Sequence, residues 1–220
     1  MRTVIFDLDG TLADTSQDLI AAANSRFRAL GHGDLLDPVA DASTAFRGGR
    51  AMLQLGFSRL GVADPAALEA EYQPFLRAYA DALDVHTTLY PGAEEAVREL
   101  ISRGYAVGLC TNKPEAPAQV LMERLGVRPL FASLIGADTL PQRKPDPAPY
   151  IAAVEQAGGA VGQSVLIGDT VTDRDTARAA GVPVILVTFG PDGDGVAKLA
   201  PDALLHGYGD LLDVVKDVIG

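Results

Sequence analysis

Two aspartates follow the first apolar run of the chain and are separated by a single residue. Val4–Phe6 reads as a buried strand, and Asp7 and Asp9 come directly after it. Because alternate residues of a strand share a face, we expect both carboxylates on one side of the strand's end. Gly10 lets the backbone turn there and approach a ligand. The pair suits nucleophilic and acid/base chemistry on a phosphate ester, although an ordinary Asp-Gly turn has the same residues.

Further polar groups follow apolar runs later in the chain. Thr111 and Asn112 offer a hydroxyl and an amide before a predicted helix, whose N-terminus favours an anion. Lys144 precedes two alternating prolines, which hold a loop extended and could fix an ammonium near a phosphate. Asp169 and Asp173 follow another predicted strand. Each group also has a purely structural explanation as a helix cap or a solvated surface side chain.

The acidic residues of these groups predict a metal site. Asp7, Asp9, Asp169 and Asp173 would repel one another unless a cation joined them. A donor set made only of oxygen atoms suits Mg²⁺, with phosphate and water completing the coordination. The chain has no Cys/His spacing typical of zinc. We therefore expect Mg²⁺ as the cofactor.

The elements that must position these residues form two blocks. Helical periodicity begins after Thr11, with Ser16 as the expected N-cap of a helix that stops at Gly31. Further helices are expected over 39–46, 51–60 and 66–83, and no strand pattern interrupts them. Residues 15–85 are therefore predicted to be a helical domain inserted into a core made of residues 1–14 and 86–220.

Helix and strand alternate from residue 89 onward. This alternation predicts an α/β fold with a parallel sheet covered on both faces, in which ligands bind beyond the carboxyl ends of the strands. The expected strands are 106–110, 134–135, 165–167 and 184–187, and the expected helices are 93–102, 116–125, 148–157, 172–180 and 210–218. The segment 190–195 is expected to be a flexible loop.

Composition limits the possible partners. The 220 residues are 48% hydrophobic and carry a formal charge of −11, which repels nucleic acid and anionic membranes. No apolar run reaches the length of a membrane span, and the N-terminus lacks a signal-peptide pattern, so we expect a cytoplasmic protein. We expect it to be a monomer or homodimer. The single Cys110 lies in an apolar run and is expected to be buried and structural.

Together these residues resemble the four motifs of the haloacid dehalogenase (HAD) superfamily of phosphatases. The motifs correspond to Asp7–Thr11, Thr111, Lys144, and Gly168–Asp169 with Asp173. The resemblance implies a Rossmann-like core with a type-1 helical cap whose hinges are Asp14 and residues 83–90. It also implies that Asp7 is the nucleophile and Asp9 the acid/base.

The same resemblance assigns the binding residues. Thr111 and Lys144 would hold phosphate with Asn112 and Gly10 beside them. The Mg²⁺ ligands would be Asp7, the Asp9 carbonyl and Asp169. Asp173 would lie next to these ligands without binding the ion itself.

Within the superfamily, three segments are most similar to those of phosphoglycolate phosphatases. They are Leu89–Gly92, Cys110–Pro114 and Arg143–Pro147. This similarity implies a small phosphorylated metabolite, 2-phosphoglycolate, as the substrate. In the expected cap, Arg47 is the candidate for binding the substrate carboxylate and Arg50 the second choice, since a guanidinium matches a carboxylate bidentately. Solvated arginines in a turn would look the same.

Other functions remain open at this level. A pyrophosphatase, a broad sugar-phosphate phosphatase and a phosphomutase share the same core. A haloacid dehalogenase would need neither Asp9 nor Mg²⁺. A non-catalytic phospho-acceptor signalling module also uses clustered acids, a Thr and a Lys, but the inserted helical block counts against it.

Overall fold

The computed structural model describes residues 1–220, which divide into two compact units. The core unit consists of Met1–Ala13 and Leu89–Gly220, and the helical unit of Asp14–Thr88. The chain passes between them in two short strands, β2 (Ala13–Asp14) and β3 (Thr88–Leu89), which pair with each other. None of the helices is both long and apolar enough to cross a lipid bilayer.

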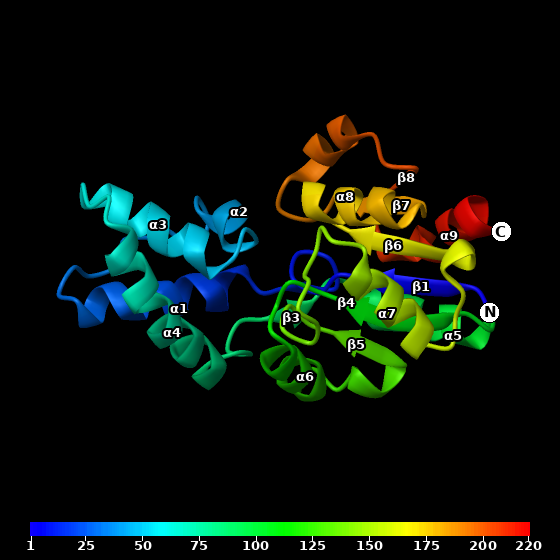
Figure 1. The fold of residues 1–220 in the computed structure, drawn as a ribbon, viewed down its shortest axis with the longest axis horizontal. Coiled ribbons are helices and arrows are strands. Elements are labelled where there is room, and N and C mark those ends of the chain that lie inside the picture. The colour runs from blue at the N-terminus through cyan, green and yellow to red at the C-terminus, as the bar shows by residue number, and fades with distance from the viewer. The chain divides into compact units, whose positions relative to one another are not determined.

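The core unit is built on one parallel sheet of six strands in the order β5-β4-β1-β6-β7-β8 (Figure 1). This confirms the predicted α/β fold. The strands are β1 (Thr3–Phe6), β4 (Ala106–Cys110), β5 (Ser133–Ile135), β6 (Ser164–Gly168), β7 (Val184–Val187) and β8 (Ala203–Leu205). The edge strand β8 was not expected from the sequence.

Helices cover both faces of this sheet, as continuous apolar strands require. The helices are α5 (Ala93–Ser102), α6 (Glu115–Arg124), α7 (Ala148–Gln156), α8 (Val171–Ala180) and α9 (Leu211–Ile219), and short 3-10 turns cover Arg128–Leu130, Val161–Gln163, Gly193–Leu199 and Tyr208–Asp210. Val4 and Phe6 of β1 join the apolar cluster that contains α5, α6 and α9 residues. Ile5 joins the cluster formed with α7 and α8. Alternate residues of the central strand thus anchor opposite helical layers.

The helical unit has its own apolar core. Its helices are α1 (Ser16–Ala29), α2 (Ala42–Ala45), α3 (Gly49–Arg59) and α4 (Pro65–Asp81). Phe27 of α1 meets Phe57 of α3 edge to face, with ring centroids 5.5 Å apart. Phe75 of α4 is also buried in this cluster. An apolar core separate from that of the sheet explains why the insertion forms a compact unit of its own.

The ends of the helical unit differ slightly from the expected boundaries. Asp14 begins this unit, and its carboxylate accepts hydrogen bonds from the backbone N–H (3.0 Å) and hydroxyl (2.6 Å) of Ser16. Helix α1 has Thr15 at its N-cap position, not Ser16 as expected. His86 and Thr87 also belong to this unit, because their backbone N–H groups donate to the buried carboxylate of Asp18 at 2.8–3.0 Å.

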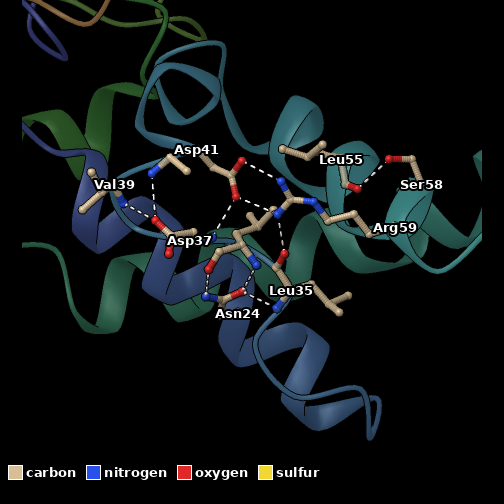
Figure 2. Close-up of polar contacts among 10 residues, drawn as sticks. Asn24, Leu35, Asp37, Val39, Asp41, Leu55, Ser58 and Arg59 are labelled. Carbon is tan, nitrogen blue, oxygen red and sulfur yellow. Dashed lines mark hydrogen bonds and ion pairs between the residues drawn. The ribbon is translucent and has the colours of Figure 1, made fainter.

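The helix expected over 39–46 is reduced to the single turn α2. Asp37 accepts hydrogen bonds from the backbone N–H groups two and three residues later, at 2.8 and 2.7 Å. Asp41 accepts from the N–H of Asp37 and from two nitrogens of Arg59, each at 2.7 Å (Figure 2). Aspartate side chains that bind nearby N–H groups compete with helix formation, which explains the shortened helix.

Candidate active site

The sheet register brings the predicted residues to one edge. Phe6 of β1 is level with Leu109 of β4 and Ile167 of β6, which flank it. Asp7 therefore leaves the central strand between the ends of its two neighbours, and its backbone N–H still donates to the Ile167 carbonyl at 2.9 Å. Thr111 follows β4 and Asp169 follows β6 at the same edge. Parallel pairing thus gathers three segments that are far apart in the sequence.

Lys144 is buried between two of the predicted acids. Its side chain is 2% exposed, and its Nζ lies 2.6 Å from Asp173 Oδ1 and 3.1 Å from Asp7 Oδ1. The Asp7 contact is an ion pair without the alignment of a hydrogen bond, because that oxygen accepts none. Burial by itself lowers the pKa of Lys144, but the Asp173 and Asp7 carboxylates outweigh it and raise the pKa. The ammonium therefore stays charged at the sheet edge.

Burial also perturbs two of the carboxyl groups. Desolvation raises the pKa of Asp7 to about 6 even though Lys144 opposes the shift, and the Asp173 and Asp9 carboxylates add to it. Desolvation, with Asp173 and Asp7, likewise raises the pKa of Asp169 well above its ordinary value. Crowding several acids where water is excluded disfavours their ionised forms unless a further cation is present.

Asp169 and Asp173 are held by different partners. Asp169 Oδ1 accepts a hydrogen bond from the Thr11 hydroxyl at 3.0 Å, and the Thr11 carbonyl accepts one from the Tyr208 hydroxyl at 2.8 Å. Asp173 Oδ2 accepts from the backbone N–H groups of Asp169 (3.2 Å) and Thr170 (3.1 Å) at the start of α8. Asp173 therefore stabilises a helix N-terminus and also neutralises Lys144.

The acidic cluster fits a small, hard cation. One oxygen from each of Asp7, Asp169 and Asp173 can be chosen so that all three lie within 4.8 Å of one another. Asp7 Oδ1 and Asp169 Oδ2 are buried and accept no hydrogen bond, whereas both oxygens of Asp173 already do. Buried carboxylate oxygens without donors are suited to a bound cation, and an oxygen-only set favours Mg²⁺ over zinc. Asp7 and Asp169 thus offer the two available oxygens.

Asp9 has a partner that the sequence did not suggest. Its Oδ1 lies 3.0 Å from the Nζ of Lys113, whose side chain is 3% exposed. The three carboxylates that lie close enough to share a metal do not include Asp9. No local pattern distinguishes Lys113 from a solvated lysine. What marks Lys113 as a candidate site residue is its burial close to two strand ends, and this burial is visible only in the folded chain.

The remaining predicted phosphate residues lie in the connecting loops. Asn112 is exposed, and its side-chain amide donates to the Lys144 carbonyl at 3.0 Å, which ties two loops of the edge together. Gly10 has a φ of +82°, as the turn after the first strand requires. Gly190 was expected only in a flexible loop, but a Cβ there would lie 2.8 Å from the Gly10 carbonyl. The loop after β7 thus packs directly against the first loop.

The helical unit contains the other candidate. Arg47 is exposed, and Arg50 forms an ion pair with Glu69 at 2.9 Å and lies 3.6 Å from the ring centroid of Tyr72. A cavity of about 530 Å³ occurs within this unit and is lined by its own residues, among them Asn24 and Arg59. Asn24 and Arg59 make internal hydrogen bonds that hold the segment between α1 and α3 (Figure 2).

Cys110 is fully buried at the end of β4, as expected for a structural thiol. Burial raises its pKa to about 12, and the nearby Lys144 opposes this shift only in part. A thiol in such surroundings stays protonated and is a poor nucleophile.

Comparison with known proteins agrees with this architecture. Residues 1–181 match the haloacid dehalogenase-like hydrolase family. A phosphoglycolate phosphatase of Rhodospirillum rubrum is 39% identical over 96% of this chain and 90% of its own length, and that of Caulobacter vibrioides is 37% identical over 99% and 90%. The crystal structure of a predicted phosphoglycolate phosphatase from Haemophilus somnus superimposes with a TM-score of 0.85 at 25% identity, covering 97% of both chains. The chain therefore belongs to the haloacid dehalogenase-like hydrolase family.

Proposed function

We propose that the chain is a Mg²⁺-dependent phosphomonoester hydrolase that acts through an aspartyl-phosphate on Asp7, with 2-phosphoglycolate as its substrate. The observation that carries the proposal is the pairing of Asp7 with the buried Lys144 at 3.1 Å, beside the carboxylate of Asp169. A carboxylate in a water-poor site next to a fixed cation suits attack on an anionic phosphoryl group.

In the first step, an Asp7 oxygen forms a bond to phosphorus while the bond from phosphorus to the ester oxygen breaks. Asp9, as a carboxylic acid, gives its proton to the departing oxygen. In the second step, the Asp9 carboxylate takes a proton from water, whose oxygen bonds to phosphorus and releases Asp7 and inorganic phosphate. Asp9 thus acts first as acid and then as base.

The other residues bind and neutralise the phosphoryl group. Lys144 would balance its charge, while the Thr111 hydroxyl, the Asn112 amide and the backbone at Gly10 would donate hydrogen bonds. One carboxylate oxygen from each of Asp7 and Asp169, with the Asp9 carbonyl, would hold Mg²⁺. Asp173 would lie next to these ligands without binding the ion itself. When bound, Mg²⁺ shields phosphoryl charge and so lets an anionic nucleophile approach.

The relatives named above support 2-phosphoglycolate as the substrate, because their similarity extends over almost the entire chain. We propose that the helical unit acts as a cap that excludes water from the site. Arg47, which is exposed in this unit, is proposed to bind the substrate carboxylate.

The test is phosphate release from 2-phosphoglycolate, pyrophosphate, sugar phosphates and nucleoside monophosphates, with and without Mg²⁺. We expect a strong preference for 2-phosphoglycolate that requires Mg²⁺. Asp7→Asn should abolish release, while the matched exposed variant Asp217→Asn should retain it. Equal weak activity on every ester would refute the substrate assignment, and full activity of Asp7→Asn would refute the mechanism.

A further inference from the structure

We infer that Lys113 recognises the carboxylate of the leaving group in addition to Arg47, so that the core unit takes part in selecting an anionic substrate. The inference rests on the proposed function, because it assigns a specificity residue to that same site. Its starting observation is a buried ammonium paired with the proposed acid/base, Lys113 Nζ to Asp9 Oδ1, at 3.0 Å.

The backbone of Lys113 fixes where its side chain begins. The Lys113 N–H donates to the Thr111 hydroxyl at 3.1 Å, and its carbonyl accepts from the N–H of Ala137 at 2.9 Å. The side chain is 3% exposed, whereas lysines are seldom buried this deeply. The buried Lys113 ammonium therefore has a defined position relative to the sheet edge.

That position is adjacent to the leaving group. To protonate the ester oxygen, Asp9 must come within about 3 Å of it. Lys113 Nζ lies 3.0 Å from Asp9 Oδ1, so it is at most about 6 Å from the ester oxygen if Oδ1 gives the proton and about 8 Å if Oδ2 does. In 2-phosphoglycolate a single methylene separates the ester oxygen from the carboxylate. The carboxylate of the bound substrate can therefore reach Lys113.

The charges of the site favour Lys113 over Lys144 for this role. Lys144 lies between Asp7 and Asp173, and in the proposed function it balances the charge of the phosphoryl group. Lys113 instead lies beside Asp9, the residue that protonates the leaving group in the proposed mechanism. An ammonium is a compact charge with three rotatable donors, so it attracts a carboxylate placed beside Asp9.

The experiment compares two substrates that differ in this one group, 2-phosphoglycolate and 2-hydroxyethyl phosphate, in which an uncharged hydroxymethyl group replaces the carboxylate. The carboxylate preference is the ratio of their kcat/KM values. Lys113→Met should lower this ratio about 10- to 100-fold, the range expected for a lost hydrogen bond to a charged group. Lys113→Arg should restore part of it. The exposed Lys216→Met, which changes the net charge equally, should leave the ratio unchanged.

Inhibition by non-hydrolysable analogues separates recognition from catalysis. 3-Phosphonopropionate carries the carboxylate and propylphosphonate lacks it. Lys113→Met should weaken inhibition by the first and spare the second. If Lys113→Met fails to fold, as judged by thermal melting, Lys113→Gln takes its place in both comparisons.

Three results would overturn the inference. An equal loss on both substrates would mean that Lys113 only orients Asp9. A wild-type protein that shows no preference for 2-phosphoglycolate over 2-hydroxyethyl phosphate would refute the proposed substrate together with this role. A wild-type preference that survives in Lys113→Met would refute the Lys113 assignment alone.

Discussion

Asp7 should make the metal-free protein less stable as the pH rises. Its pKa is raised from 3.8 to about 6 in the folded protein, chiefly by burial. Between these two values the folded state binds more protons than the unfolded state, so raising the pH favours unfolding. The stabilising effect is therefore present below the unfolded pKa and is lost as the pH rises through the folded one.

The size of the effect follows from the shift. Two pKa units correspond to about 3 kcal/mol in total, of which about 1.4 kcal/mol is lost between about pH 5 and pH 7. For a chain of this length such a loss lowers the melting temperature by about 3–6 °C. Asp169, whose pKa is also raised, should add to the loss in the same direction.

The assay is thermal melting of metal-free protein, prepared with a chelator, across this pH range. Asp7→Asn removes the titrating group and should reduce the pH-dependent loss by about 1 kcal/mol or more, whereas the exposed Asp217→Asn should behave as wild type. Mg²⁺ should stabilise wild type more at the higher pH, because protons compete with it for the same oxygens. Equal pH dependence in wild type and Asp7→Asn would refute the reasoning.

Three further substitutions test the packing of the site. Lys144→Met leaves two buried carboxylates without their cation and should lower the free energy of unfolding, measured in urea near pH 7, by about 3 kcal/mol. The exposed Lys216→Met should lower it by less than about 0.5 kcal/mol, and equal costs would contradict the buried pairing. Tyr208→Phe removes the hydrogen bond to the Thr11 carbonyl and should lower the free energy of unfolding by about 1–2 kcal/mol. An unchanged urea midpoint would argue against that bond. Gly190→Ala places a Cβ 2.8 Å from the Gly10 carbonyl in the first loop. It should lower the free energy of unfolding by about 1–3 kcal/mol and slow phosphate release. Wild-type stability and rate would contradict this contact.

Local periodicity was enough to predict most of the core. Four of the sheet strands after the first were located within one residue at each end, because continuous apolar runs bounded by turn residues are strong strand signals. The edge strand β8 was missed, since its three residues Ala203–Leu205 form a run too short to stand out. Around Asp37 and Asp41, helical periodicity was misleading because side chains bonded the backbone instead.

The sequence by itself determined which chemical groups stand at the strand ends. The two-residue period of a strand predicted Asp7 and Asp9 on one side of the strand's end, and alternation of helix and strand implied that Thr111 and Asp169 would reach the same edge. These are consequences of local pattern and of the few ways in which parallel strands can be connected.

Only the tertiary structure decided how those groups are paired. Lys113 meets Asp9 across 104 residues of chain, and Lys144 meets Asp173 across 29. The contact between Gly190 and the first loop likewise joins distant segments. Such pairings depend on which side chains lose water together when strands and loops pack, and burial, unlike periodicity, is not encoded in the neighbouring residues.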